Sequence, residues 1–183
     1  MQKRSHILMA NTLLRNQCGF GARRYNWAFL FGSFEPDVNP LSYLKGSVQH
    51  KKLRGHNYAN SRAYINSQIQ KLQRRSRWTI WQYYTLGKLT HYLADAFTYP
   101  HNENYPDTML SHHKYETDLR HFLAGYLAHR QLQRQQVRRD IVAALEELHD
   151  QYMAARAGTY RDARFICKAT SLLVEGCLPG SVA

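Results

Sequence analysis

Two histidine–carboxylate pairs stand close together in the middle of the chain. His91 precedes Asp95 by four residues, His112 precedes Glu116 by four residues, and His101 lies between the pairs. On an α-helix, residues four apart lie on one face, so the members of each pair can converge on one ion. Imidazole nitrogens and carboxylate oxygens suit zinc and leave coordination positions open for water or substrate. The pattern therefore predicts a metallohydrolase.

Three residues upstream extend this candidate ligand set. His6 lies at the start of the first expected helix, and Asp37 and His56 lie in a stretch that we expect to be irregular. His50 competes with His56 for one position, and we favour His56 because it stands directly before an expected helix. The set of eight candidate ligands is His6, Asp37, His56, His91, Asp95, His101, His112 and Glu116.

The remaining histidines have no convergent partners in the pattern. His113 follows His112 directly, so on a helix it points about 100° away, and we expect it to support the site from outside or to lie at the surface. His121, His129 and His149 are expected on helix surfaces.

Helical periodicity dominates the elements that must position these residues. Pro36 and Pro40 indicate an irregular stretch up to about residue 56. We find no internal repeat and no linker, so we predict an all-α fold, a single domain over residues 1–183. It would be a multi-helix bundle with a multinuclear zinc site between the helices. The expected helices cover about residues 5–17, 25–31, 58–75, 78–97, 111–135, 137–157 and 160–176.

The positive charge of the chain is unevenly distributed. The 183 residues carry a net charge of +12. Residues 1–77 hold 14 Lys and Arg against two acids, whereas residues 78–183 hold 11 of each, so the whole excess lies in the N-terminal part. Such a surface attracts polyanions, either anionic lipid headgroups or nucleic-acid phosphates.

Cysteine usage and hydropathy indicate a compartment. The three cysteines, Cys18, Cys167 and Cys177, include no C-x-x-C pair, which favours reduced thiols. The N-terminal residues lack a signal-peptide core, and no apolar run reaches the ~18 residues of a membrane span. We expect a cytoplasmic protein, and the sequence is compatible with peripheral contact with a membrane.

The order of the candidate ligands resembles the zinc-dependent phospholipase C family, which shares its fold and its trinuclear zinc site with the S1/P1-type nucleases. The closest local matches are His91-Tyr-Leu-Ala-Asp95, the ten-residue step to His101, and His112-His-Lys-Tyr-Glu116. The matched segments span residues 5 to 116.

The resemblance implies two or three zinc ions held by the eight residues. Asp37, His56, His91 and Asp95 would hold a first zinc, and His101, His112 and Glu116 a second. A third would take His6 and share Asp95. In the family the third ion is completed by the amino group and carbonyl of a mature N-terminal tryptophan. This sequence has no such residue, and Met1 to Ser5 could lend backbone groups only if the terminus folds back.

The resemblance also implies the reaction, which is zinc-assisted hydrolysis of a phosphodiester. A carboxylate matching Asp37 orients or deprotonates the attacking water, and the first choice of substrate is the headgroup bond of a phospholipid. One alternative is a nuclease for single-stranded nucleic acid on the same zinc site. Another is a non-catalytic, zinc-stabilised helical module that binds a membrane or a protein partner through its basic face.

Overall fold

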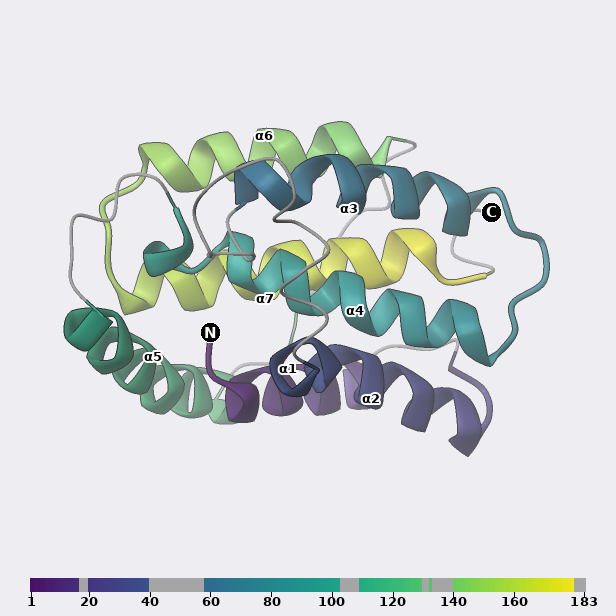
Figure 1. Ribbon diagram of the computed structural model, residues 1–183, viewed down its shortest axis with the longest axis horizontal. Helices are drawn as coiled ribbons and strands as arrows, with labels where there is room; N and C mark the ends of the chain where they lie inside the picture. Colours follow the sequence, from purple (N-terminus) through teal and green to yellow (C-terminus); the bar gives the residue numbers. More distant parts are fainter. Residues whose placement is uncertain (17–19, 40–57, 103–108, 130–131, 133–139, 180–183) are drawn as a thin grey trace.

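The computed structural model describes residues 1–16, 20–39, 58–102, 109–129, 132 and 140–179 (Figure 1). These residues form helices and connecting turns, with no strand among them, which confirms the all-α prediction. The helices are α1 (Lys3–Asn16), α2 (Arg23–Val38), α3 (Tyr58–Gln73), α4 (Ile80–Ala96), the short 3-10 helix η2 (Tyr99–His101), α5 (Met109–His129), α6 (Ile141–Ala154) and α7 (Thr159–Cys177).

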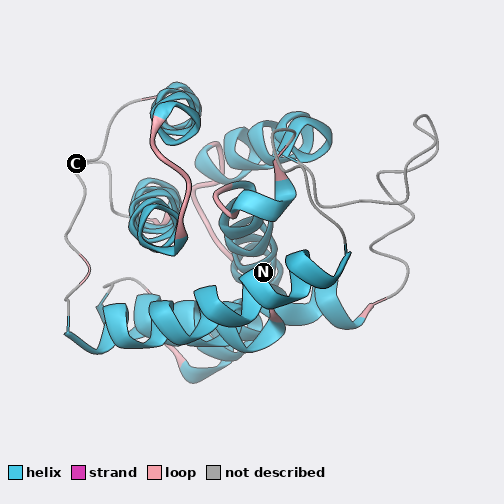
Figure 2. Ribbon diagram, turned by 90° about the vertical axis from the view of Figure 1, so that its left-hand side faces the viewer, coloured by secondary structure: helices cyan, strands magenta, loops and turns pink. Residues whose placement is uncertain are grey.

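The helices are arranged around α4 and α7. In Figure 1 these two lie between α3 and α6 on one side and α1, α2 and α5 on the other. Figure 2 shows the bundle after a 90° turn, with several helices seen nearly end-on. Buried apolar side chains from all seven α-helices join in one hydrophobic cluster, and the amphipathic spacing of the sequence is the reason that each helix contributes a face to it.

Helix α2 is longer than the sequence predicts. The expected helix ended near residue 31, but the structure continues it through Pro36 to Val38, so that prediction was wrong. A proline in the last turn removes only one backbone hydrogen bond, and the Asn39 amide still donates to the Glu35 carbonyl at 3.0 Å. Asp37 therefore lies on a helix and not in an irregular segment, while His50 and His56 fall outside the described residues.

Two glycines allow α2 and α4 to pack backbone against backbone. A Cβ atom at Gly32 would overlap the carbonyl oxygen of Tyr84, and one at Gly87 would overlap the carbonyl oxygen of Phe29. Any larger residue would force the helices apart. One turn beyond this contact, His91 Nδ1 lies 3.0 Å from the Ser33 carbonyl oxygen, so the glycine contact sets the position of His91.

His149 is buried, which corrects the expectation that it lies on a helix surface. Its ring stacks on Tyr58 at 3.7 Å between centroids, and its Nε2 lies 3.2 Å from Asn102 Oδ1. Burial lowers the pKa of His149 to about 4 because the charged imidazolium loses hydration. His121 and His129 are exposed, as predicted.

Two of the three cysteines lie within the described residues. Cys167 and Cys177 are buried and form no disulfide, and burial raises the pKa of each thiol to about 12. Cys18 lies outside the described residues. No helix in the described part of the chain is long and apolar enough to cross a membrane.

Replacing Gly87 by alanine tests the close contact of α2 with α4. We expect Gly87→Ala to lower the free energy of unfolding by about 3 kcal/mol, because its methyl group meets backbone atoms that cannot rotate away. Gly125→Ala is the matched control, since a Cβ atom at that position on α5 would meet nothing within 4 Å, and it should stabilise by roughly 0.5 kcal/mol. Urea denaturation measures both, and equal effects would contradict the role of the contact.

The buried imidazole predicts a loss of stability in acid. The pKa of His149 is lower in the folded than in the unfolded chain, so the unfolded state binds the extra proton. The stability that the neutral ring provides is complete above a pH of about 6.5 and disappears as the pH falls toward 4. We expect the advantage of the wild type over His149→Gln to shrink by about 2 kcal/mol between pH 7 and 4.5. Exposed His129→Gln is the control, and a constant difference for His149→Gln would contradict the prediction.

Candidate metal centre

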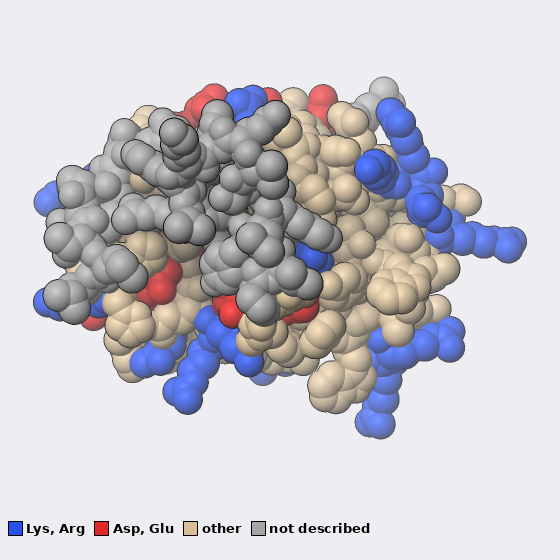
Figure 3. Space-filling model, in the orientation of Figure 1, with Lys and Arg blue, Asp and Glu red and all other residues tan. Residues whose placement is uncertain are grey.

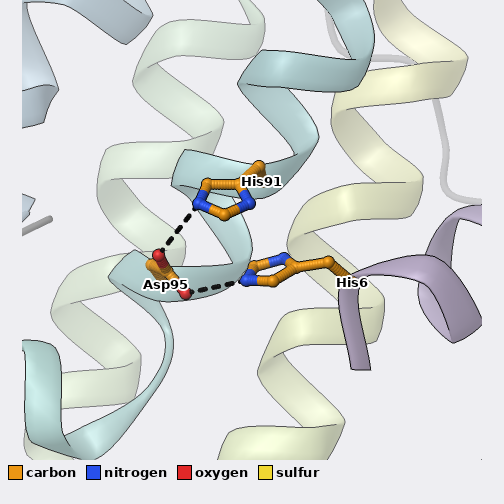
Figure 4. Close-up of side chains that lie close together, drawn as sticks. All are labelled: His6, His91 and Asp95. Atoms are coloured by element: carbon orange, nitrogen blue, oxygen red, sulfur yellow. Dashed lines mark ion pairs between the residues drawn. The ribbon is translucent and has the colours of Figure 1, made fainter. Parts of the chain in front are cut away.

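A buried group of three side chains lies where α1 meets α4 (Figure 4). His6 Nε2 is 3.2 Å from Asp95 Oδ1, and His91 Nε2 is 3.4 Å from Asp95 Oδ2. The two imidazole rings stack, with their centroids 3.9 Å apart. Two nitrogens thus face one carboxylate from different sides, and all three side chains are at most 2% exposed.

The tautomer of His91 follows from its neighbour on α2. The carbonyl oxygen of Ser33 can only accept, so Nδ1 of His91 carries the hydrogen in their 3.0 Å contact. In the neutral ring Nε2 then presents a lone pair toward Asp95, which is the arrangement of histidines that bind metals. The buried Nε2 of His6 makes no hydrogen bond with the described residues. The donor set and the unsatisfied nitrogen both fit a zinc ion.

Asp37 lies at the edge of this group. From the last turn of α2, its Oδ1 is 3.7 Å from His91 Nε2, and its Oδ2 is 4.0 Å from His6 Nε2. Its side chain is 19% exposed, whereas Asp95 is enclosed. Of the two carboxylates, Asp37 is therefore the one that water can reach.

A second group joins η2 to α5. His101 Nε2 and His112 Nε2 lie 3.2 and 3.1 Å from the same oxygen of Glu116, Oε1. The two rings stand edge to face with centroids 5.3 Å apart. The i,i+4 pair on α5 and the isolated histidine on η2 are thus brought together, in the grouping that the family resemblance implies. His113 is exposed, in line with its predicted position beside the site.

The nitrogen of Met1 connects the two groups. It lies 2.7 Å from Asp95 Oδ1, 2.9 Å from Glu116 Oε1 and 2.8 Å from His101 Nε2. Burial would lower the pKa of this amino group, but the charges of Asp95 and Glu116 outweigh burial and raise its pKa to about 10. The N-terminal residues therefore do fold back onto the site, and one nitrogen contacts a carboxylate of each group.

The carboxylates of both groups are held in their ionised form. Burial alone would raise the pKa of Asp95, but the Met1 amino group and the surrounding histidines hold it well below its usual range. Burial acts on Glu116 in the same way, and hydrogen bonds from His101 and His112 lower its pKa overall. Burial and the Met1 charge also lower the pKa of His101, which favours the neutral ring that a metal needs. The centre thus brings together anionic oxygens, imidazole nitrogens and one positively charged amino group.

A buried carboxylate that the sequence pattern did not reveal supports the second group. Asp162 on α7 accepts hydrogen bonds at Oδ2 from the Tyr99 amide at 2.8 Å and from the Tyr115 hydroxyl at 2.7 Å. Its Oδ1 accepts from the Tyr152 hydroxyl at 2.9 Å and from Arg161 at 3.2 Å. Asp162 has no metal-ligand spacing, and the sequence shows only an Arg161-Asp162 pair near the start of this helix.

These hydrogen bonds place Asp162 in contact with both elements that carry the candidate ligands of the second group. Tyr99 begins η2, which ends at His101, and Tyr115 directly precedes Glu116 on α5. A single fixed carboxylate thus holds the backbone of one ligand-bearing element and a side chain of the other. Such supporting contacts determine how well ligands converge on a metal.

Comparison with known proteins identifies one family. A family model described as zinc dependent phospholipase C matches residues 5–159, a range that contains all eight candidate ligands. Searches of the curated proteins and of the solved structures found no match. Asp162 lies just beyond the matched range.

Asp162→Asn tests whether this carboxylate orients the second ligand group. The amide nitrogen would face donors that need an acceptor, so we expect a loss of about 2–3 kcal/mol in stability. We also expect zinc at the group of His101, His112 and Glu116 to bind 10- to 100-fold more weakly. Asp140→Asn is the matched control, because asparagine also caps the start of α6. Calorimetric zinc titration and thermal unfolding measure the two effects.

The two readouts distinguish orientation of ligands from stability alone. If Asp162→Asn unfolds more easily but binds zinc with the affinity of the wild type, the network stabilises the bundle without orienting the ligands.

Proposed function

The chain belongs to the zinc-dependent phospholipase C family, and from this premise we propose that it hydrolyses the headgroup phosphodiester bond of a phospholipid. One observation carries the proposal beyond the family match. The two candidate ligand groups adjoin, because the Met1 nitrogen contacts Asp95 of one and Glu116 of the other. Adjacent metal positions suit a phosphate, which offers several oxygens to neighbouring cations.

We propose two or three zinc ions in this centre, with Asp95 shared between two of them. The geometry supports sharing, because Asp95 Oδ1 faces His6 while Oδ2 faces His91. His91, with Asp37 and His56, would complete the position of the first ion. His101, His112 and Glu116 would hold the second. The position of His56 is not among the described residues, so its assignment rests on the sequence.

The nitrogen of Met1 is placed where a third ion needs a further donor. It lies 2.7 Å from the oxygen of Asp95 that also faces His6. We propose that His6, together with the Met1 amino group once it has lost its proton, supplies the nitrogen donors of this position. A cation there would replace the charged amino group as the partner of the buried carboxylate.

The chemistry divides between zinc and the residues of the chain. Bound zinc would offset the negative charge on the phosphate and lower the pKa of a water toward ~7. Asp37 is the partly exposed carboxylate at the edge of the centre, so it can hold that water by a hydrogen bond and accept its proton. The imidazole of His91 is fixed by the Ser33 carbonyl and keeps its nitrogen aimed at the centre. Asp95 is enclosed, which suits a ligand and not a base.

A nuclease on the same centre is the second candidate. The observation in its favour is the basic N-terminal part of the chain, since 14 of the 25 Lys and Arg lie within residues 1–77 beside only two acids. Phosphate backbones attract such a surface as anionic lipids do. The third candidate is a zinc-stabilised module without activity. It would bind zinc at the same centre but would hydrolyse no substrate.

Zinc content and Asp37→Asn together test the proposed reaction. We expect at least two zinc ions per chain in protein purified without added metal, and phosphorylcholine release from dispersed short-chain phosphatidylcholine. Asp37→Asn should keep the fold and lower kcat by about 10²- to 10⁴-fold, because the amide cannot accept the proton of the water. Asp118→Asn, at an exposed position on α5, is the matched control and should keep the full rate.

Each candidate function predicts a different outcome. Fewer than two zinc ions per chain would contradict both hydrolase proposals. Cleavage of single-stranded DNA without cleavage of phospholipid would favour the nuclease. If Asp37→Asn retains its zinc and the full rate, the role of Asp37 is wrong even if the reaction is right.

A further inference from the structure

Helix α2 exposes apolar side chains on the face that points away from the core. Trp27, Phe31, Phe34 and Val38 follow one another at intervals of four, three and four residues, so they share one face. Trp27 is 69% exposed, Phe31 51% and Val38 50%. Phe29, on the other side of the helix, is fully buried. A surface helix normally has polar residues on its outer face, and α2 is apolar on both.

The start of α4 continues this surface. Ile80 and Trp81 are 44% and 69% exposed. The ring of Tyr84 joins the two helices, because its centroid is 6.0 Å from that of Phe31 and 6.2 Å from that of Trp81. Together these residues form a continuous surface, here named the aromatic strip, made of Trp27, Phe31, Phe34, Val38, Ile80, Trp81 and Tyr84.

Basic side chains surround the aromatic strip. Exposed arginines lie at the start of α2, at the end of α3 and in the turn before α4, and in Figure 3 two groups of Lys and Arg project from this end of the molecule with uncharged surface between them. Lys3 lies over the ring of Phe34 at 5.0 Å, and Lys88 over the ring of Tyr84 at 5.6 Å. The only acids in α2 are Glu35, which pairs with Lys88 at 3.5 Å, and Asp37, and residues 58–94 contain no acid. The arginines are Arg23, Arg24, Arg74, Arg75 and Arg77.

We propose that the aromatic strip and its arginines bind the surface of a bilayer that contains anionic phospholipids. This inference rests on the proposed function and adds the physical form in which the substrate is met. Tryptophan rings favour the level of the headgroups, and arginines at the edge of an apolar face reach anionic phosphates while their aliphatic stems stay on the apolar surface. The charge of the strip's surroundings complements the charge of such a membrane.

The aliphatic members of the strip favour lipid over single-stranded nucleic acid. Bases stack on aromatic rings, and Val38 and Ile80 have no ring on which to stack. Both add hydrocarbon surface that a bilayer can accept. The strip also leads to the metal centre, since Val38 directly follows Asp37, about 16 Å along α2 from Trp27. A bilayer in contact with the whole strip would lie beside the water-accessible edge of the centre.

Vesicle co-sedimentation tests this inference with two pairs of variants. Binding is measured to vesicles of phosphatidylcholine alone and of phosphatidylcholine mixed with phosphatidylglycerol, in an Asp37→Asn background so that lipid is not consumed. We expect the parent to bind the mixed vesicles, and Trp27→Ala with Trp81→Ala to weaken binding more than tenfold. Arg23→Gln with Arg24→Gln should weaken it by about fivefold for each arginine removed. All four positions are exposed, so we expect the fold to remain intact.

The controls remove the same kinds of side chain elsewhere on the surface. Tyr160→Ala removes an aromatic ring that is 52% exposed on α7, and Arg156→Gln with Arg164→Gln removes two exposed arginines. We expect these variants to bind mixed vesicles as the parent does. The inference is wrong if the strip variants bind as tightly as their controls. It is also wrong if the parent binds single-stranded DNA through the strip and does not bind vesicles.

Activity separates this inference from the proposed function. In the background with Asp37 intact, the strip variants should lose rate on mixed vesicles and keep it on dispersed short-chain phosphatidylcholine. Vesicle binding through the strip without any phospholipid hydrolysis would support the surface and reject the function. Phospholipid hydrolysis that depends neither on vesicles nor on the strip would support the function and reject the surface.

Discussion

A carboxylate buried at the centre of a helical bundle is the constraint on which the rest of this structure depends. Asp95 is 2% exposed, and an ionised group so far from water is tolerated only with opposite charge and hydrogen bonds around it. Three separate parts of the chain surround it, and the Met1 amino group supplies the positive charge. His6 approaches from α1, His91 lies one turn earlier on α4, and the Met1 nitrogen lies 2.7 Å away. A multivalent cation would neutralise such a site more fully than a single amino group, which agrees with the zinc dependence of the family.

Residues outside the candidate ligand set hold the helices around Asp95 in place. Gly32 and Gly87 let α2 approach α4 closely enough for Asp37 to lie near His91. Asp162 joins α7 to the elements that present His101 and Glu116. The positions of the candidate ligands thus depend on the packing of helices, and a metal bound there would stabilise the bundle because it would bind only the folded arrangement.

Helix α2 links the metal centre to the surface. Its inner face packs on α4, its last turn carries Asp37, and its outer face carries the aromatic strip. The proposed function and the proposed membrane contact therefore depend on the same helix, with the phosphate of a lipid expected where water reaches the centre. The basic residues of the N-terminal part, which the sequence alone assigned only to some polyanion, gather in part around this strip.

Local regularities in the sequence predicted much of the fold and the candidate ligand pairs. The spacing of apolar residues predicted helices near each of the seven observed ones, because one face of each must reach the core. The i,i+4 rule identified both histidine–carboxylate pairs, since that spacing places side chains together within a single helix. Only the tertiary structure decided what depends on distant residues. It extended α2 through Pro36, buried His149, brought His6 beside His91 and returned Met1 to the centre. It also assigned Asp162 a supporting role, because hydrogen bonds between four elements leave no periodic trace in a sequence.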